Sequence, residues 1–331
     1  MEKVLLKLLI GLVIILSGAE LFTNGVEWLG KKLKLSQSAV GSILAAVGTA
    51  LPESMVPVVA IFFGAGEAGQ HIGVGAILGA PFMLVTLGLA LVGLGAIVYN
   101  KRRESGTIVV VNRAQLQRDM SFFLLFYSLA VVASFLPIWG KYIIALALVA
   151  GYGWYAWQTI QGECEEIGHC PPLYLARKSP DPKLWLVVTQ VAVALALIIA
   201  GAHSFVGGVE QLAARIGLSP LLVALILAPV ATELPEKFNS IIWMRKSKDI
   251  LAAGNMTGAM VFQSSLLPAF GLVFTPWKLE GIGLTSALLA IAAGVVVWLF
   301  NNRRPGRLPG QLMTTLALFY AIFGYLAIRS V

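Results

Sequence analysis

The sequence predicts an all-α membrane protein with ten transmembrane helices in two inverted five-helix repeats, the second and seventh helices being interrupted. Three observations carry this prediction: the composition, the spacing of the apolar runs, and a segment that occurs twice. Of the 331 residues, 58% are hydrophobic and 12% are charged. Soluble domains carry about 25% charged residues, so this composition is typical of a chain that crosses a membrane many times.

Ten apolar runs have the length that a membrane helix needs. A hydrocarbon core of about 30 Å takes about 20 residues of helix. The sequence shows no alternation of apolar and polar residues, so a membrane β-barrel is not predicted. The expected spans are residues 4–29, 38–63, 72–99, 119–136, 141–160, 184–212, 219–244, 250–275, 281–300 and 310–329.

The basic residues between these spans predict the orientation. The loops on one side contain 17 lysine and arginine residues, and those on the other side contain 6. Because cytoplasmic loops are enriched in these residues, we expect both termini outside, in a multi-pass protein of the plasma or inner membrane. The net charge of +8 is explained by this bias, so no nucleic-acid partner is expected beside the lipid bilayer.

A duplicated segment divides the chain into halves. Residues 18–53 align without a gap to residues 201–236, with 18 of 36 positions identical, and residues 75–84 align to 254–263. We predict a first repeat over 1–160 with its motif at 40–84, a cytosolic linker over 161–183, and a second repeat over 184–331 with its motif at 223–263. Five spans in each half make the second half inverted. Inverted halves with interrupted helices are typical of secondary transporters.

The repeated motif places proline beside acidic residues inside predicted spans. Proline lacks the N–H that closes a helical turn, so Pro52 and Pro235 are expected to interrupt the second and seventh spans at mid-depth. Backbone carbonyls released there are oxygen ligands. An intramembrane carboxylate is costly and is functional by default, which applies to Glu53 and Glu236.

Each carboxylate has a threonine four residues before it. Thr49 therefore shares a helix face with Glu53, and Thr232 shares one with Glu236. Inverted symmetry would bring the two faces together into a cage of oxygen atoms. Such hard ligands suit Ca²⁺, although Mn²⁺ also accepts them.

The motifs "GTALPES", "ATELPEK", "GAILGA" and "GNMTGA" resemble the two alpha-repeats of the sodium/calcium exchanger family, in the calcium/cation antiporter superfamily. The short linker resembles that of prokaryotic members. The resemblance implies antiport of Ca²⁺ for Na⁺ or H⁺ by a functional monomer, with no cofactor. It also implies that Glu53 and Glu236 are the central Ca²⁺ carboxylates and that Thr49 and Thr232 lend oxygen.

The chain departs from the family pattern where family members coordinate Na⁺. The serine after the motif threonine is replaced by Ala50 and by Glu233, and a position that is often acidic holds Leu84 and Gln263. Glu233 adds a third carboxylate three residues before Glu236. Clustered carboxylates raise one another's pKa, so H⁺ becomes a reasonable coupling ion beside Na⁺. Both coupling ions stay open, and we include Glu233 and Gln263 in the candidate site.

Two other functions compete with transport. An intramembrane hydrolase would need a nucleophile–base pair or a metal motif, which the sequence lacks, so no enzyme is predicted. A degenerate transporter that acts as a cation-binding sensor or scaffold is the alternative. In the linker, Cys164, His169 and Cys170 offer ligands for a regulatory metal, but a solvated acidic loop explains the same residues.

Overall fold

The computed structural model describes residues 1–32, 45–160 and 171–329, without the side chains of residues 45–52, 160, 234–236, 238 and 239. Cys164, His169 and Cys170 therefore lie outside the described residues. The chain forms two compact units. Unit 1 comprises residues 1–70 and 153–216, and unit 2 comprises residues 71–152 and 217–331. Each unit thus contains segments from both predicted halves.

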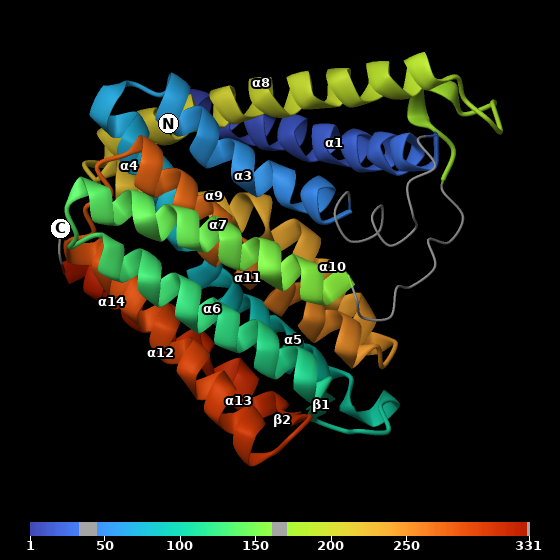
Figure 1. The fold of residues 1–331 in the computed structure, drawn as a ribbon, viewed down its shortest axis with the longest axis vertical. Coiled ribbons are helices and arrows are strands. Elements are labelled where there is room, and N and C mark those ends of the chain that lie inside the picture. The colour runs from blue at the N-terminus through green and yellow to red at the C-terminus, as the bar shows by residue number, and fades with distance from the viewer. Residues whose placement is uncertain (33–44, 161–170, 330–331) are drawn as a thin grey trace. The chain divides into compact units, whose positions relative to one another are not determined.

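The described chain is helical almost throughout (Figure 1). Two short strands, β1 (Ile108–Val110) and β2 (Arg307–Pro309), pair antiparallel with Val109 opposite Leu308. Short 3₁₀ turns lie at η3 (Asn100–Arg102) and η4 (Tyr174–Ala176), and η2 (Leu84–Gly88) is a π-helical turn. The α-helices are α1 (Glu2–Lys32), α3 (Ala45–Phe63), α4 (Gly66–Met83), α5 (Leu89–Val98), α6 (Arg113–Ala133), α7 (Ile138–Ile160), α8 (Leu184–Ile216), α9 (Pro220–Thr232), α10 (Leu234–Arg245), α11 (Asp249–Phe274), α12 (Gly281–Arg303), α13 (Gly310–Thr315) and α14 (Ala317–Arg329).

Seven helical segments in the described part are long and apolar enough to cross a membrane. They correspond to seven of the predicted spans and are Glu2–Lys32, Gly66–Val98, Arg113–Ala133, Leu184–Ile216, Asp249–Phe274, Gly281–Arg303 and Gly310–Arg329. The other three predicted spans correspond to α3, to α7, and to α9 and α10 together. The number of ten spans stays a prediction.

In unit 1, α1 and α8 lie side by side (Figure 1) and approach closely because glycines recur along α1 every seven residues. A Cβ atom on Gly11 would lie 2.8 Å from the backbone nitrogen of Phe205, and one on Gly18 would lie 3.1 Å from the carbonyl oxygen of Ala194. Small residues let helix backbones come together where lipid provides no hydrophobic drive.

The end of the linker is bonded to this helix pair. Trp28 Nε1 donates to the carbonyl oxygen of Pro171 at 2.8 Å. Asn24 Oδ1 accepts from the backbone N–H of Tyr174 at 3.2 Å and from Gln190 Nε2 at 2.9 Å. The Asn24 and Gln190 side chains are both buried. Their amide groups therefore satisfy each other and hold the linker against α1 and α8.

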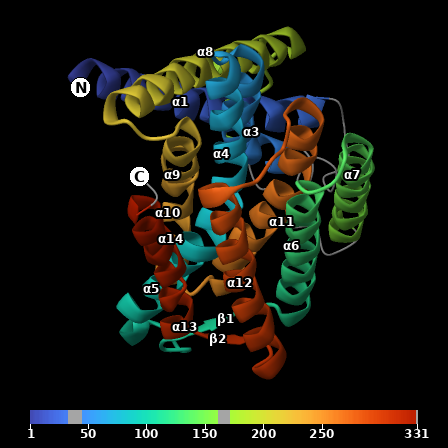
Figure 2. The ribbon, with the colours of Figure 1, turned by 90° about the vertical axis from the view of Figure 1, so that its left-hand side faces the viewer.

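In unit 2, α6 packs against α11 and α12 (Figure 2), and one end of the unit is fastened by a buried ion pair. Arg103 donates to both carboxylate oxygens of Asp249, at 2.8 and 2.6 Å. The same carboxylate accepts from the backbone N–H of Val110 at 2.9 Å, and Arg103 also donates to the carbonyl oxygen of Met244 at 3.2 Å. Strand β1 and the ends of α10 and α11 are thereby joined.

The seventh predicted span is interrupted, as its two prolines predict. Helix α9 ends at Thr232 and α10 begins at Leu234, with Glu233 between them. Pro229 and Pro235 each remove a backbone donor within two turns, and the second proline stands in the first turn of α10, where its missing N–H costs nothing.

The predicted interruption of the second span is absent from the described part of that span. Helix α3 continues from Ala45 to Phe63 through Pro52. A single proline removes one backbone hydrogen bond, and a helix that packs well can continue past it. Helix α11 likewise continues through Pro268, and α4 includes Pro81. Two prolines close together, as in the seventh span, have a greater effect.

Candidate ion site

Pro229, inside α9, leaves a backbone carbonyl of that helix without its helical donor, and this carbonyl faces α4. Pro229 has no N–H to donate to the carbonyl of Leu225, one turn earlier. Gly79 of α4 packs directly on that carbonyl, where a Cβ atom would lie 2.1 Å from the oxygen. Gly75, one turn earlier on α4, makes a similar approach to the carbonyl of Leu221, at 2.4 Å. The glycines of "GAILGA" therefore seat α4 against the interrupted helix.

Glu233 stands at the break and is fully buried. Its Oε1 accepts a hydrogen bond of 2.6 Å from Nε2 of Gln263, which is also buried, on α11. Gln263 Oε1 has no hydrogen-bond partner among the described residues. The structure thus brings together two predicted site residues that are 30 positions apart. A carboxylate and a free amide oxygen are both hard ligands for a cation.

Thr232 lies beside this pair, at the end of α9. Its side chain is buried, and its hydroxyl donates to the carbonyl oxygen of Ala228 at 3.0 Å. A hydroxyl that donates to the backbone keeps its lone pairs for a cation. The geometry of Thr232, Glu233 and Gln263 is therefore consistent with an oxygen-lined site within unit 2.

The remaining predicted ligands are described only in part. Glu53 is buried on α3, in unit 1, with an exposed fraction of 6%. Helices α3 and α10 include Thr49 and Glu236, but these two side chains lie outside the described residues. Among the described side chains, no three His, Cys, Asp or Glu residues are grouped so as to hold a metal ion. The cage predicted across the two repeats is therefore not tested.

Two buried polar residues on α10 were not predicted from the sequence. Lys237 is 3% exposed and Ser240 is fully buried. They follow Glu233 by four and seven positions, so all three share one face of the helix. That spacing was the signal, because a lysine inside an apolar span marks a functional position as a glutamate does.

At the positions equivalent in the repeat, the two halves differ in chemistry. Gln263 of α11 is matched by Leu84, which is fully buried at the start of the π-helical turn η2. Within this turn the Thr86 hydroxyl donates to the carbonyl oxygen of Phe82 at 2.6 Å. The polar pair with Glu233 therefore has no counterpart at Leu84, whose side chain has no polar atom.

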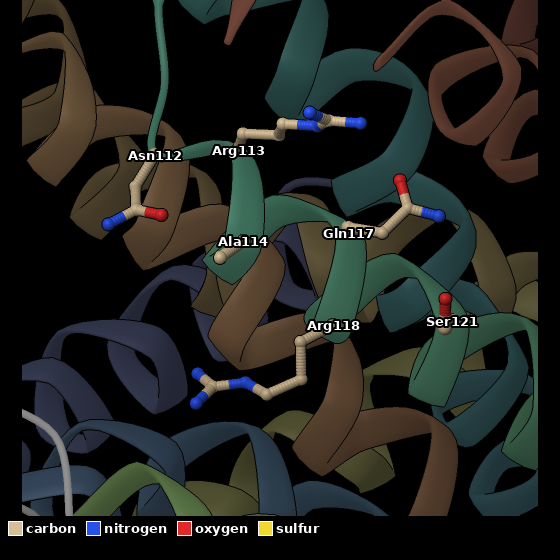
Figure 3. A pocket seen from close by; sticks show the side chains of 6 residues that line it. All are labelled: Asn112, Arg113, Ala114, Gln117, Arg118 and Ser121. Atoms are coloured by element: carbon tan, nitrogen blue, oxygen red, sulfur yellow. The ribbon is translucent and has the colours of Figure 1, made fainter. Parts of the chain in front are cut away.

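A separate open pocket of about 760 Å³ lies along the first turns of α6 (Figure 3). Arg113 and Arg118, which line it, point away from each other (Figure 3), and Arg118 donates to the buried Asp119 at 3.1 Å. The other lining residues are Asn112, Ala114, Gln117 and Ser121. Because its charged groups do not converge, this pocket is not part of the candidate ion site.

Comparison with known proteins gives the chain relatives over nearly its whole length. A protein of Alkalimonas amylolytica named as an antiporter, CaxA, is 24% identical over 313 residues, which cover 91% of this chain and 90% of the relative. The solved H⁺/Ca²⁺ exchanger CAX has the same fold, with a TM-score of 0.74 at 20% identity, over 99% of this chain and 86% of that chain. The sodium-calcium exchanger NCX_Mj matches with a TM-score of 0.57 at 20% identity, over 99% and 98%.

The sequence also matches the family model described as sodium/calcium exchanger protein. The match covers residues 3–161 and 186–328, and so includes both motif copies and every candidate ligand. The members of this family are membrane antiporters for inorganic cations. The break at Glu233, the helical membrane architecture and the match over both halves lead to one conclusion: the chain belongs to the sodium/calcium exchanger family.

Proposed function

We propose that the protein is a secondary antiporter that moves Ca²⁺, or a similar divalent cation, across the membrane in exchange for H⁺ or Na⁺ by alternating access. Glu53, Glu236, Thr49, Thr232, Glu233 and Gln263 are the proposed ligands. The protein would act as a monomer in the plasma or inner membrane, with both termini outside. Its repeats would span 1–160 and 184–331, joined by the cytosolic linker 161–183.

One observation carries this proposal. A buried carboxylate, Glu233, stands where the helix is broken by prolines, and it is bonded to Gln263 of the neighbouring helix at 2.6 Å. Irregular backbone at membrane depth is tolerated where it lines a cavity or is buried in protein. Together with the family membership, the pair supports a cation site at this break.

The α1–α8 contacts support the inverted repeat. Gly18 approaches Ala194, and Gly201 approaches Gly11. Aligned residues of the two halves differ in number by 183. Gly18 is therefore equivalent to Gly201, and Ala194 to Gly11, so the two contacts are equivalent to each other. The approach of Gly25 to Val191 corresponds in the same way to that of Gly208 to Leu8. Such pairing is expected of two helices related by a two-fold axis.

The divalent cargo and the coupling ion are argued from chemistry. The H⁺/Ca²⁺ exchanger CAX and the sodium-calcium exchanger NCX_Mj, which share the fold, both handle Ca²⁺. A third carboxylate at Glu233, in a motif whose serine is missing, favours H⁺ over Na⁺. A sensor or scaffold that binds Ca²⁺ without moving it is the competing function.

Uptake of ⁴⁵Ca²⁺ into proteoliposomes tests the proposal, with the Na⁺ gradient and the pH gradient applied separately. We expect uptake under one gradient and a loss of at least about 100-fold in Glu53→Gln and in Glu236→Gln, because each removes a charged ligand. Glu67→Gln, at an exposed residue of α4, is the matched control and should retain full uptake.

Glu233→Ser restores the family residue and identifies the coupling ion. If the pH gradient drives wild-type uptake and Glu233→Ser abolishes it, Glu233 takes part in proton exchange. If only the Na⁺ gradient drives uptake, the coupling ion is Na⁺. Ca²⁺ binding without uptake under either gradient would contradict the antiporter and leave the scaffold.

A further inference from the structure

Lys237 lies inside the seventh predicted span and is buried in the structure. Its side chain is 3% exposed, whereas Lys246, just beyond the end of α10, is exposed. Lysine near a membrane boundary usually extends its ammonium to water, but a buried one needs a compensating charge. The question is which carboxylate provides that charge.

Among the carboxylates of this span whose side chains are described, Glu233 is the nearest to Lys237 along the helix, and it is buried. The Lys237 backbone N–H donates to the Glu233 carbonyl at 3.0 Å, so the two residues stand one helical turn apart on the same face. Two other buried carboxylates of unit 2 already have arginine partners: Asp249 bonds to Arg103 and Asp119 bonds to Arg118.

The same face of α10 also has unused bonding capacity. Ser240 is fully buried three residues after Lys237, and its hydroxyl has no hydrogen-bond partner among the described residues. Gln263 Oε1, beside Glu233, also has no hydrogen-bond partner among the described residues. Buried polar atoms are normally bonded, so these oxygens point to a ligand that binds along this face.

We propose that Lys237 is a built-in counter-cation of the ion site and determines which cations the site accepts. This inference rests on the function proposed above. The ammonium of Lys237 offsets the charge of Glu233. The net negative charge that the site presents to a divalent ion is therefore one less than the number of its carboxylates. A monovalent cation bound beside Glu233 would offset the charge of this carboxylate in the same way. Because the ammonium of Lys237 already offsets that charge, Na⁺ is excluded from this position.

The first repeat provides a comparison within the chain. The position equivalent to Lys237 is Ser54, which directly follows Glu53 and carries no charge. Lys237 therefore makes the two copies of the motif electrostatically different. The copy of the motif that has the additional carboxylate, Glu233, is thus also the copy that has the positive charge, Lys237.

Equilibrium binding of ⁴⁵Ca²⁺ to the purified full-length protein tests this role, in NaCl and in N-methyl-D-glucamine chloride at equal ionic strength. Lys237→Gln removes a positive charge within one helical turn of Glu233, so we expect Ca²⁺ affinity to rise about tenfold or more. Na⁺ should then compete with Ca²⁺, whereas we expect no such competition in the wild type. Lys237→Arg should keep the wild-type pattern. Lys246→Gln, the matched control with the same charge change, should alter nothing.

The double variant Glu233→Gln/Lys237→Gln keeps the net charge and, measured beside the two single variants Glu233→Gln and Lys237→Gln, completes a double-mutant cycle. The double variant should bind Ca²⁺ without competition from Na⁺. If the single variant Lys237→Gln does not fold, the double variant should still fold. Unchanged or weaker Ca²⁺ affinity in a monodisperse Lys237→Gln protein would overturn the role of Lys237 but leave the proposed function. Failure of the double variant to rescue a misfolded Lys237→Gln would also overturn it. A wild-type protein that binds no Ca²⁺ would instead contradict the proposed function itself.

Discussion

At the scale of single residues, the exposed ion pair between Lys32 and Asp181 shows how a charge near the linker is tuned. Lys32 Nζ lies 2.5 Å from Asp181 Oδ1, and the Asp181 side chain is 77% exposed. The hydrogen bond from Lys32, and then its positive charge, hold the pKa of Asp181 below its usual value. The contribution of this pair to stability is present above the ordinary pKa of aspartate and is lost as pH falls through the lowered one. Exposure keeps that contribution small.

Lys32→Gln should therefore raise the pKa of Asp181 toward its ordinary value, because the positive charge and the ammonium that donates to Asp181 are removed. The chain contains only three aspartates, so ¹³C-aspartate labelling gives a titration that can be assigned by substitution. Lys178→Gln, at an exposed lysine of the linker, is the control and should leave the titration unchanged. An Asp181 pKa that does not move in Lys32→Gln would contradict the ion pair.

Residue chemistry could be predicted from the sequence where a motif marked it. Glu233 and Gln263 were both predicted from the sequence, and the structure joins them directly. Lys237 and Ser240 were not predicted, because the motif ends before them and the positive-inside rule counts lysines only in loops. Burial of these side chains depends on how α10 packs against its neighbours, and the sequence alone does not determine that packing.

At the scale of helices, close approach between α4 and α9 depends on one glycine. Gly79 places its Cα against the Leu225 carbonyl that Pro229 leaves without a donor, and a Cβ there would also lie 2.8 Å from Pro229 Cγ. The obstacle includes backbone atoms on a helix, so it cannot move as a flexible side chain would.

Gly79→Ala should destabilise the protein by about 1–3 kcal/mol or more, because α4 and α9 must separate. Gly153→Ala is the matched control. Beyond its own helix, no atom of the described residues lies within 4 Å of its new Cβ on α7, and loss of a helical glycine should stabilise by about 0.5–1 kcal/mol. Thermal unfolding in detergent, followed by size-exclusion chromatography, measures both. A Gly79→Ala protein as stable as the wild type would show that the two helices are not held at this distance.

The helices themselves were largely predictable, and the error is informative. Runs of apolar residues predicted the long spans because membrane helices must satisfy their own backbone. The interruption in the second span was wrong over Ala45–Phe63, since one proline at Pro52 does not break a helix. The break in the seventh span was correct, and there Pro229 adds to Pro235.

At the scale of the whole molecule, halves of the sequence and compact units do not coincide. The predicted repeats divide the chain near residue 161, but unit 1 combines residues 1–70 with 153–216. Sequence alignment identifies the segments that are equivalent in the two halves. Packing determines which of these segments contact each other. Helices α1 and α8, equivalent in the repeat, pack against each other in one unit. This pairing could not be derived from the spans alone.

The bonded linker has a consequence for the continuity of the chain. Several contacts of its described part are made through its backbone: the Pro171 carbonyl accepts from Trp28, and the N–H groups of Tyr174 and Leu175 donate to Asn24 and Gln190. Such contacts hold a segment in place whether or not a peptide bond precedes it. Fragments 1–160 and 171–331, produced together from separate genes, should therefore assemble into a stable complex that copurifies from the membrane. Asn24→Leu should weaken that assembly more than it destabilises the intact protein. In the intact protein the covalent chain keeps the linker close to α1, whereas two separate fragments must associate.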